Sequence, residues 1–385
     1  MLVSSKFKNP AVWLTVGFVG YLVILGAWGI ITPDRKLSEF ENRALSQLPS
    51  FTWSKLWDGR FTEQWDQYLV DQFVGRDQWV SLKSSLERAS GKLENHNVFF
   101  GDHDYLFERF STPSSQLDRN LSELLTFAQD RQAAGNRLFT LFVPLSQEIY
   151  PEYMPPYAAA TSTSSEQIIA EAVEQLGDTV TNVPVTDQLW AHKEESIYFR
   201  TDHHWTMRGA YWGYRQFAEA AGLQPITPDQ LRSVIVSDAF YGTYYTKAND
   251  SAIAPDQLEL AHPVSLPSYE VCPSDNAPCT NSIYYESALQ ERDQYKLFFN
   301  GNPTWVQITT QADSGRSIAV FKDSYANVMM PYLIKHYDNI IMIDMRYFRH
   351  QVHEFFQEHP VDDILFLYGV RTLAEDDIFK WLNRK

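Results

Sequence analysis

The sequence contains few cysteines and has a deficit of basic side chains. Two Cys occur among 385 residues, and 32 Lys and Arg stand against 48 Asp and Glu, which gives a net charge of −16. Two cysteines are too few for a zinc ribbon or a disulfide-stapled miniprotein. Nucleic acid requires a concentrated basic surface, and an anionic membrane surface attracts basic patches, so the acidic balance argues against both.

The chain has ample apolar and aromatic material. Hydrophobic residues make up 44% and aromatic residues 15%, including 21 Tyr and 11 Trp. This length and composition suffice for a sizeable core in one large domain or two smaller ones. Most of the aromatic side chains are expected in that core, but the cluster at residues 240–245 also suits a sugar-binding groove.

Residues 11–31 contain no charged side chain and are long enough, as a helix of about 30 Å, to cross a bilayer. Lys6 and Lys8 precede this run, and Trp28 lies near its far end, where an indole ring suits the headgroup region. We expect residues 1–32 to be an uncleaved membrane anchor. A cleaved signal peptide is the alternative, and both interpretations place the remaining chain outside the cytoplasm, in the periplasm or at the cell surface.

Cys272 and Cys279 flank a short loop rich in turn-forming residues. This spacing makes a local disulfide sterically feasible, which would fit an oxidising compartment. Two free thiols are the alternative.

The exported part divides into two regions. Residues 33–96 are predicted to be a stalk and a membrane-proximal helical segment. This segment forms either one long helix or, if Gly75 interrupts it, two shorter helices. From residue 97 to 385 short apolar runs alternate with helical stretches, and the clearest runs are 137–143, 317–321, 339–343 and 363–368. This alternation predicts an α/β domain with a parallel sheet and flanking helices, whose ligands bind at the carboxyl ends of the strands.

Ser324 follows one of these predicted strands, where the strand would turn into a helix. A serine at such a turn is raised above the sheet edge, and backbone N–H groups at the helix start can stabilise an oxyanion. A capping role for Asp323 or Ser324 is the plainer interpretation.

A second motif runs from Asp202 to Thr206, and Thr206 is a good N-cap for the amphipathic helix that follows. If Asp202, His203 and His204 are extended, Asp202 and His204 lie on one side and His203 on the other. A carboxylate beside an imidazole orients the base that a serine nucleophile needs. These three residues are also metal-ligand types, but no HxxxH or HExxH spacing is present, so we predict no metal site.

Six segments together resemble the DHHW family, which belongs to the SGNH-hydrolase-like superfamily and is similar to the alginate O-acetyltransferases. The segments are residues 202–211, residues 322–331, residues 343–347, residues 38–43, residues 71–77, and residues 143–151. The resemblance covers nearly all of the chain after the predicted anchor.

The resemblance implies an SGNH-like fold, no cofactor, and a catalytic triad in which Ser324 is the nucleophile, His204 its base and Asp202 the orienting carboxylate. His203 occupies a variable position and receives no catalytic role. The Ser324 N–H is expected to contribute to an oxyanion hole. Asn327, Arg346 and Tyr347 are expected to contact the substrate or the oxyanion.

One departure concerns the nucleophile motif, because Lys322 stands where SGNH esterases carry glycine. The turn that forms the oxyanion hole should therefore differ from that of the esterases.

Together these features predict an extracytoplasmic O-acetyltransferase or esterase that acts on a cell-surface polysaccharide through an acyl-serine. The resemblance also implies a membrane-bound acyltransferase as acyl donor. A non-catalytic glycan-binding or assembly protein and a metal-dependent phosphoesterase are the rival predictions.

Overall fold

The computed structural model describes residues 10–111, 114–274 and 277–384, and these residues form two compact units. The first extends to Gly91 and includes Asn249–Ala252. The second contains Lys92–Ala248 and the chain from Ile253 onward.

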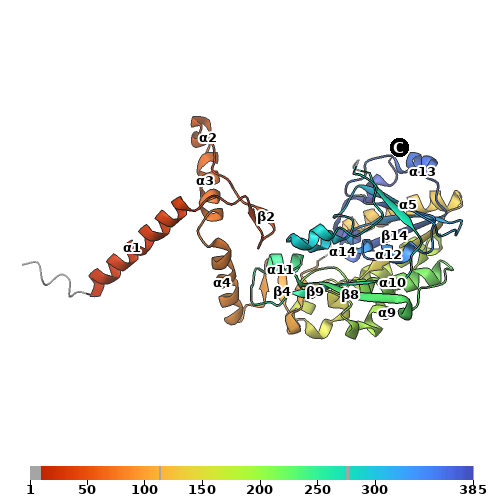
Figure 1. Cartoon of the computed structure of the whole chain (residues 1–385), viewed down its shortest axis with the longest axis horizontal. Coiled ribbons are helices and arrows are strands. Elements are labelled where there is room, and N and C mark those ends of the chain that lie inside the picture. The colour runs from red at the N-terminus through yellow and green to blue at the C-terminus, as the bar shows by residue number, and fades with distance from the viewer. Residues whose placement is uncertain (1–9, 112–113, 275–276, 385) are drawn as a thin grey trace, which may run out of the picture. The chain divides into compact units, whose positions relative to one another are not determined.

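The first unit begins with helix α1, Pro10–Ile31, whose mean hydropathy of 2.1 and length are sufficient to cross a membrane (Figure 1). Two short strands follow, β1 (Leu37–Ser38) and β2 (Arg43–Ala44), and then α2 (Trp53–Trp57), α3 (Arg60–Asp71) and α4 (Arg76–Ala89). Gly75 separates α3 from α4 with a φ of +66°, a conformation that favours glycine. The segment therefore forms separate helices, which was one of the two predicted arrangements.

The second unit is built on a seven-stranded sheet with the order β10-β11-β13-β12-β14-β6-β7. These strands are β6 (Arg137–Val143), β7 (Thr181–Asn182), β10 (Tyr269–Pro273), β11 (Trp305–Thr310), β12 (Ser317–Lys322), β13 (Asn339–Ile343) and β14 (Asp363–Gly369). From β13 to β7 the neighbours pair in parallel, while β10 and β11 add an antiparallel edge. The four predicted strands and the predicted α/β class are confirmed.

Helices cover both faces of this sheet, because successive side chains along its strands point alternately into two hydrophobic clusters. On β12, Ile318 and Val320 belong to the cluster that contains residues of α10, whereas Ala319 and Phe321 belong to the cluster that contains residues of α5. The helices are α5 (Ser114–Ala133), α6 (Ser146–Ile149), α7 (Pro156–Ala159), α8 (Ser165–Leu176), α9 (Thr186–Ala191), α10 (Met207–Ala220), α11 (Thr243–Ala248), α12 (Met330–Leu333), α13 (Val352–Glu358) and α14 (Val370–Glu375). Two smaller sheets accompany them: β3 (Glu94–Asn95), β4 (Val98–Phe100) and β5 (Leu106–Glu108) form one, and β8 (Leu231–Phe240) and β9 (Asp256–Pro263) form the other.

The sequence predicted a helix that begins directly at Ser324, but the structure has no continuous helix there. The chain forms a 3₁₀ turn, η9 (Ser324–Ala326), and then the short α12, which has Pro331 in its first turn. Proline lacks a backbone N–H and is therefore accepted at a helix start but not in the interior of a helix that began at Ser324. Cys272 on β10 and Cys279, which lies beyond this strand, form the predicted disulfide.

Candidate active site

The candidate nucleophile lies at the carboxyl edge of the sheet. Strand β12 ends at Lys322, and Asp323 then accepts hydrogen bonds from the backbone N–H groups of Tyr325 (3.0 Å) and Gly369 (2.9 Å). Because Gly369 ends the neighbouring strand β14, Asp323 joins the ends of two parallel strands. Ser324 follows this joint and is 9% exposed. Asp323 is therefore the cap that the plainer interpretation foresaw, and its capping fixes the position of Ser324.

The loop that carries the candidate base is closed at both ends. Tyr198 and Trp205 form an antiparallel bridge, and the Phe199 N–H donates to the His204 carbonyl at 3.3 Å. Thr206 caps α10 as predicted, accepting from the Gly209 N–H at 3.3 Å. The Trp205 indole N–H donates to the Tyr325 carbonyl at 2.8 Å, which ties this loop to the turn that bears the serine.

Three side chains form one line of hydrogen bonds across the two loops. His204 Nδ1 lies 2.5 Å from Asp202 Oδ1, and His204 Nε2 lies 2.6 Å from Ser324 Oγ. Asp202 and His204 are 2% and 4% exposed, so water competes little for these bonds. An Nδ1–H donor to Asp202 leaves Nε2 as the acceptor for the serine proton, which is the tautomer that a general base requires.

Asp202 is held by backbone groups on both of its oxygens. Oδ1 accepts from the His204 N–H at 3.0 Å, and Oδ2 accepts from the Thr243 N–H at 2.7 Å. Burial alone would raise the pKa of Asp202, but the charges of His203 and His204 and these hydrogen bonds lower its pKa well below the usual range. The carboxylate is therefore ionised at every pH at which the protein would work.

The alternation predicted around His203 was conditional on an extended chain, and only its first part holds: Asp202 and His204 face each other at 2.5 Å. The loop bends instead of extending, because Asp202 accepts from the N–H two residues ahead in an Asx turn. His203 Nδ1 consequently lies 3.5 Å from Asp202 Oδ1, and the rings of His203 and His204 have centroids 3.7 Å apart. His203 bonds to Thr243 Oγ1 at 2.7 Å.

Tyr295 and the segment Gly242–Thr243 also contribute to the site, but the sequence around Tyr295 gives no sign of this, and the sequence around Gly242 gives only an ambiguous one. The Tyr295 ring stacks on His204 with centroids 4.0 Å apart, and its hydroxyl donates to the Ser324 carbonyl at 3.2 Å. Tyr295 lies far from both motifs along the chain, and nothing around it marks a site. Gly242 and Thr243 lie within the aromatic cluster that suggested sugar stacking, but the rings of Phe240, Tyr244 and Tyr245 are buried, so they serve the core.

The three residues predicted to contact substrate or oxyanion lie apart from this line of hydrogen bonds. Asn327 is 1% exposed, and its Oδ1 accepts from Lys322 Nζ at 3.0 Å. Arg346 instead forms a two-bond ion pair with Asp344, at 2.8 and 2.6 Å. Tyr347 is 53% exposed and lies beside Arg346. The Asn327 backbone N–H donates to the Ser324 carbonyl at 3.2 Å. Among the described residues, however, no side chain of the three forms a hydrogen bond or ion pair with Asp202, His204 or Ser324.

Lys322 is a buried side chain at the end of β12, two residues before Ser324. Its Nζ lies 2.9 Å from Asn302 Oδ1 and 3.5 Å from Asp344 Oδ2, in addition to Asn327. Burial lowers the pKa of Lys322 to about 8. The residue that replaces the esterase glycine therefore ties the ends of β12 and β13 together.

The backbone N–H of Ser324 has no hydrogen-bond acceptor within the part of the chain that the structure describes. A 3₁₀ turn leaves its first N–H groups without partners inside the turn. This N–H can therefore donate to an oxyanion formed beside Ser324 Oγ.

Asp202, His203 and His204 also offer ligand atoms within 4.8 Å of one another, a spacing that a metal ion could bridge. Both Asp202 oxygens and His204 Nδ1 are already engaged in hydrogen bonds, so metal binding would require His204 to release its Nδ1 proton and its partner. The arrangement fits proton transfer better than metal ligation.

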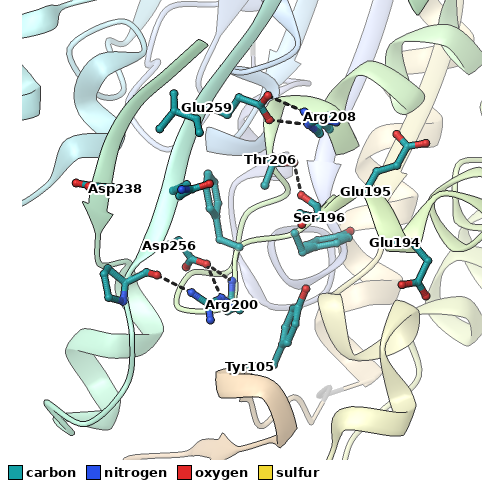
Figure 2. A pocket seen from close by; sticks show the side chains of 15 residues that line it. Tyr105, Glu194, Glu195, Ser196, Arg200, Thr206, Arg208, Asp238, Asp256 and Glu259 are labelled. Atoms are coloured by element: carbon teal, nitrogen blue, oxygen red, sulfur yellow. Dashed lines mark hydrogen bonds and ion pairs between the residues drawn. The ribbon is translucent and has the colours of Figure 1, made fainter. Parts of the chain in front are cut away.

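A pocket of about 650 Å³ lies beside the loop, but the triad does not line it (Figure 2). Its walls include Tyr198, Arg200 and Thr206, which flank the motif in sequence, and Figure 2 shows the ion pairs Arg200–Asp256 and Arg208–Glu259 there. Through Asp256, which also accepts from the Thr201 N–H at 2.8 Å, this region supports the loop.

The chain is similar in sequence to one curated protein. The chain is 24% identical over 234 residues to a probable alginate O-acetylase AlgJ of Pseudomonas syringae pv. tomato, which covers 58% of this chain and 56% of that protein. The chain thus spans little more than half the length of this curated relative.

Two solved structures share the fold. A DHHW family protein from Eubacterium siraeum superposes with a TM-score of 0.66 at 24% identity, covering 76% of this chain and 98% of that one. PatB1 of Bacillus cereus, solved with a sulfonyl adduct, gives a TM-score of 0.61 at 16% identity, covering 74% and 96%. The resemblance inferred from the motifs is confirmed at the level of the fold.

The family assignment rests on a match over most of the second unit. Residues 98–343 match the family model described as DHHW protein. This range is more than half of the chain and includes both motifs. The chain therefore belongs to the DHHW family.

Proposed function

We propose that this protein is an extracytoplasmic O-acyltransferase that moves an acetyl group onto a cell-surface polysaccharide through an acyl-serine. The observation that carries the proposal is the unbroken line of hydrogen bonds from Asp202 through His204 to Ser324. In the proposal residues 1–32 anchor the protein, residues 33–96 form the membrane-proximal segment, and residues 97–385 form the catalytic domain.

The first half of the reaction forms the acyl-enzyme. His204 Nε2 takes the proton of Ser324 Oγ as that oxygen attacks the carbonyl carbon of an acetyl ester. The oxyanion accepts a hydrogen bond from the Ser324 N–H, and Asp202 stabilises the imidazolium that forms. The tetrahedral intermediate collapses, and His204 returns the proton to the departing alkoxide of the donor.

The second half repeats these steps with a sugar hydroxyl as nucleophile. His204 removes the hydroxyl proton, the sugar oxygen attacks the acetyl carbon, and Ser324 leaves as the alcohol after receiving the proton. Attack by water in place of the sugar would make the same site an esterase.

The similarity to a probable alginate O-acetylase supports a polysaccharide as acceptor. The apolar helix α1 supports attachment to a membrane, where a membrane-bound acyltransferase would present the acyl group. The glycan-binding rival predicts a serine and a histidine held apart. The Ser324 Oγ to His204 Nε2 distance of 2.6 Å therefore favours chemistry.

The test is acylation of the protein by an activated acetyl ester, followed by peptide mass spectrometry. We expect an acetyl group on the peptide that contains Ser324, and no adduct in Ser324→Ala. Ser317→Ala is the matched control, because Ser317 lies at the opposite end of the same strand, bonded to Asp362. An adduct that persists in Ser324→Ala, or none in the wild type, would overturn the mechanism.

A further inference from the structure

An aromatic surface in the first unit has no role in the site described above. Five rings form a continuous row in which successive centroids are 5.2 to 6.0 Å apart, in the order Trp53, Phe51, Phe61, Trp65 and Tyr68. Phe51 and Trp53 are 52% and 67% exposed. We call this row, together with Leu69 and Phe73, the aromatic face.

Helix α3 carries the middle of the aromatic face, whereas Phe51 and Trp53 precede this helix and Phe73 follows its end at Asp71. Phe61, Trp65 and Leu69 follow one another at intervals of four residues within α3, which places them on one stripe. Leu69 is 50% and Phe73 is 43% exposed, whereas the opposite side of α3 carries polar residues such as Glu63 and Gln67. Soluble surfaces rarely expose a contiguous apolar stripe of this kind, so it indicates an interaction site.

The stripe continues into a groove between α3 and α4. The groove has a volume of about 410 Å³ and is lined by Leu69, Val70, Phe73, Trp79 and Val80 together with Arg76. A lining of this composition accepts hydrocarbon rather than a charged ligand.

The aromatic face begins where the apolar helix α1 ends. Tyr68, the last ring of the row, donates its hydroxyl to Asp34 Oδ1 at 3.0 Å, three residues after α1 ends at Ile31. The next residue, Arg35, donates its N–H to Gln72 Oε1 at 2.9 Å and forms an ion pair with Asp77 at 2.7 Å. These bonds fix the turn between α3 and α4 to the end of α1.

We infer that the aromatic face lies in the bilayer interface, so that α1 crosses the membrane and α3 rests on its surface. Trp, Tyr and Phe side chains favour the zone between headgroups and acyl chains. Between residues 53 and 89 there are five Lys and Arg against six Asp and Glu, so attraction to anionic lipid does not contribute and apolar insertion must hold the segment. The inference rests on the membrane crossing by α1 that belongs to the proposed function.

Such a surface contact has a consequence for the proposed reaction. It would hold the residues that follow α1 at a fixed depth at the membrane, instead of leaving them as a free tether. An acyl donor presented from within the bilayer would then meet a segment that stays at one depth relative to the membrane surface.

The test uses the full chain with one introduced cysteine at a time, labelled with an environment-sensitive fluorophore in nanodiscs of phosphatidylcholine. The two native cysteines are joined in a disulfide, so the introduced thiol is the reactive one. Leu69→Cys and Trp65→Cys report on the aromatic face, and Gln67→Cys is the matched control on the polar side of the same helix. Leu22→Cys, in the middle of α1, reports on the membrane crossing.

We expect lipids that carry a quencher near the headgroup to reduce the emission at positions 65 and 69 at least about twofold more than at position 67. The result should not change when anionic lipid or salt is added. Emission from position 69 that is polar and unquenched would place the face in water and overturn the inference. Emission that is apolar but unquenched by lipid would mean that protein covers the face, which also overturns it.

The probe at position 22 separates this inference from the membrane crossing. If position 22 is quenched by a deep lipid quencher while positions 65 and 69 are not, α1 crosses the membrane and the surface contact is wrong. If position 22 is unquenched, the anchor proposal fails, and quenching at positions 65 and 69 then decides the surface contact by itself.

Discussion

Gly242 provides the sharpest test of how the site is held. A Cβ added to Gly242 would lie 2.6 Å from Asp202 Cγ and closer still to two other atoms of the same side chain. The displaced atoms cannot retreat cheaply, because Asp202 is fixed by bonds from the N–H groups of His204 and Thr243. Gly242→Ala must therefore move Asp202 or shift the loop that orients it.

The expected loss follows from what Asp202 does for His204. In serine proteases, loss of the orienting carboxylate lowers the turnover number by about 10⁴, and a displaced but still ionised carboxylate should cost less. We expect Gly242→Ala to lower the rate of acylation of Ser324 by about 10² to 10⁴, with an overpacking cost of about 1–3 kcal/mol in the free energy of unfolding.

The assay is the initial rate of release from a chromogenic acetyl ester, measured together with chemical denaturation. Gly315→Ala is the control, because Gly315 has a φ of +67° and open space around it. That substitution should cost about 1 kcal/mol of stability and leave the rate unchanged. If folded Gly242→Ala kept more than half of the wild-type rate, the contact between Gly242 and Asp202 would not control the base.

Three further predictions concern Lys322, Tyr295 and the disulfide. Burial lowers the pKa of Lys322 to about 8 from its usual 10.5. Between pH 8 and 10.5 the unfolded chain therefore binds this proton while the folded state does not. The free energy of unfolding, relative to that of Lys322→Met, should consequently rise over this pH range. The full rise is about 3 kcal/mol, and a difference in denaturation free energy that is flat with pH would contradict it. Tyr295→Leu removes the ring stacked on His204 and should lower the acylation rate about tenfold, whereas Tyr295→Phe should stay within about threefold; equal rates for the two variants would refute a role for the ring. Replacing Cys272 and Cys279 by serine should cost about 2–3 kcal/mol in thermal or chemical unfolding but leave acylation unchanged, since two strands separate β10 from β12; a loss of rate in the folded variant would contradict this.

The elements that could be predicted from the sequence are those whose conformation is set by residues close together in the chain. The apolar runs that became β6, β12, β13 and β14 alternate with helices, and this alternation suffices to predict a parallel sheet. Thr206 could be identified as a cap because its partner, Gly209, lies three residues away. The line from Asp202 to Ser324 joins residues 122 positions apart in the chain, and only the family resemblance could pair them.

The parts that sequence did not predict depend on distant partners. Tyr295 reaches His204 through the fold, and no pattern near residue 295 indicates this contact. The extended chain on which the alternation around His203 depended does not form, because the Asp202 side chain competes with the extended conformation by bonding to the His204 N–H. The antiparallel edge strands β10 and β11 pair with each other although about thirty residues separate them in the chain, and periodicity alone does not set this register.

A single-turnover experiment shows whether Ser324 passes an acetyl group to a sugar. The protein is first acetylated with an activated ester, the ester is removed, and de-acetylated cell-surface oligosaccharide is added. Mass spectrometry then follows the acetyl group on the Ser324 peptide and on the sugar over time. We expect the sugar to speed the loss of acetyl-Ser324 and to gain the acetyl group in equal amount. Loss at the rate seen in water alone, with no acetylated sugar, would contradict it.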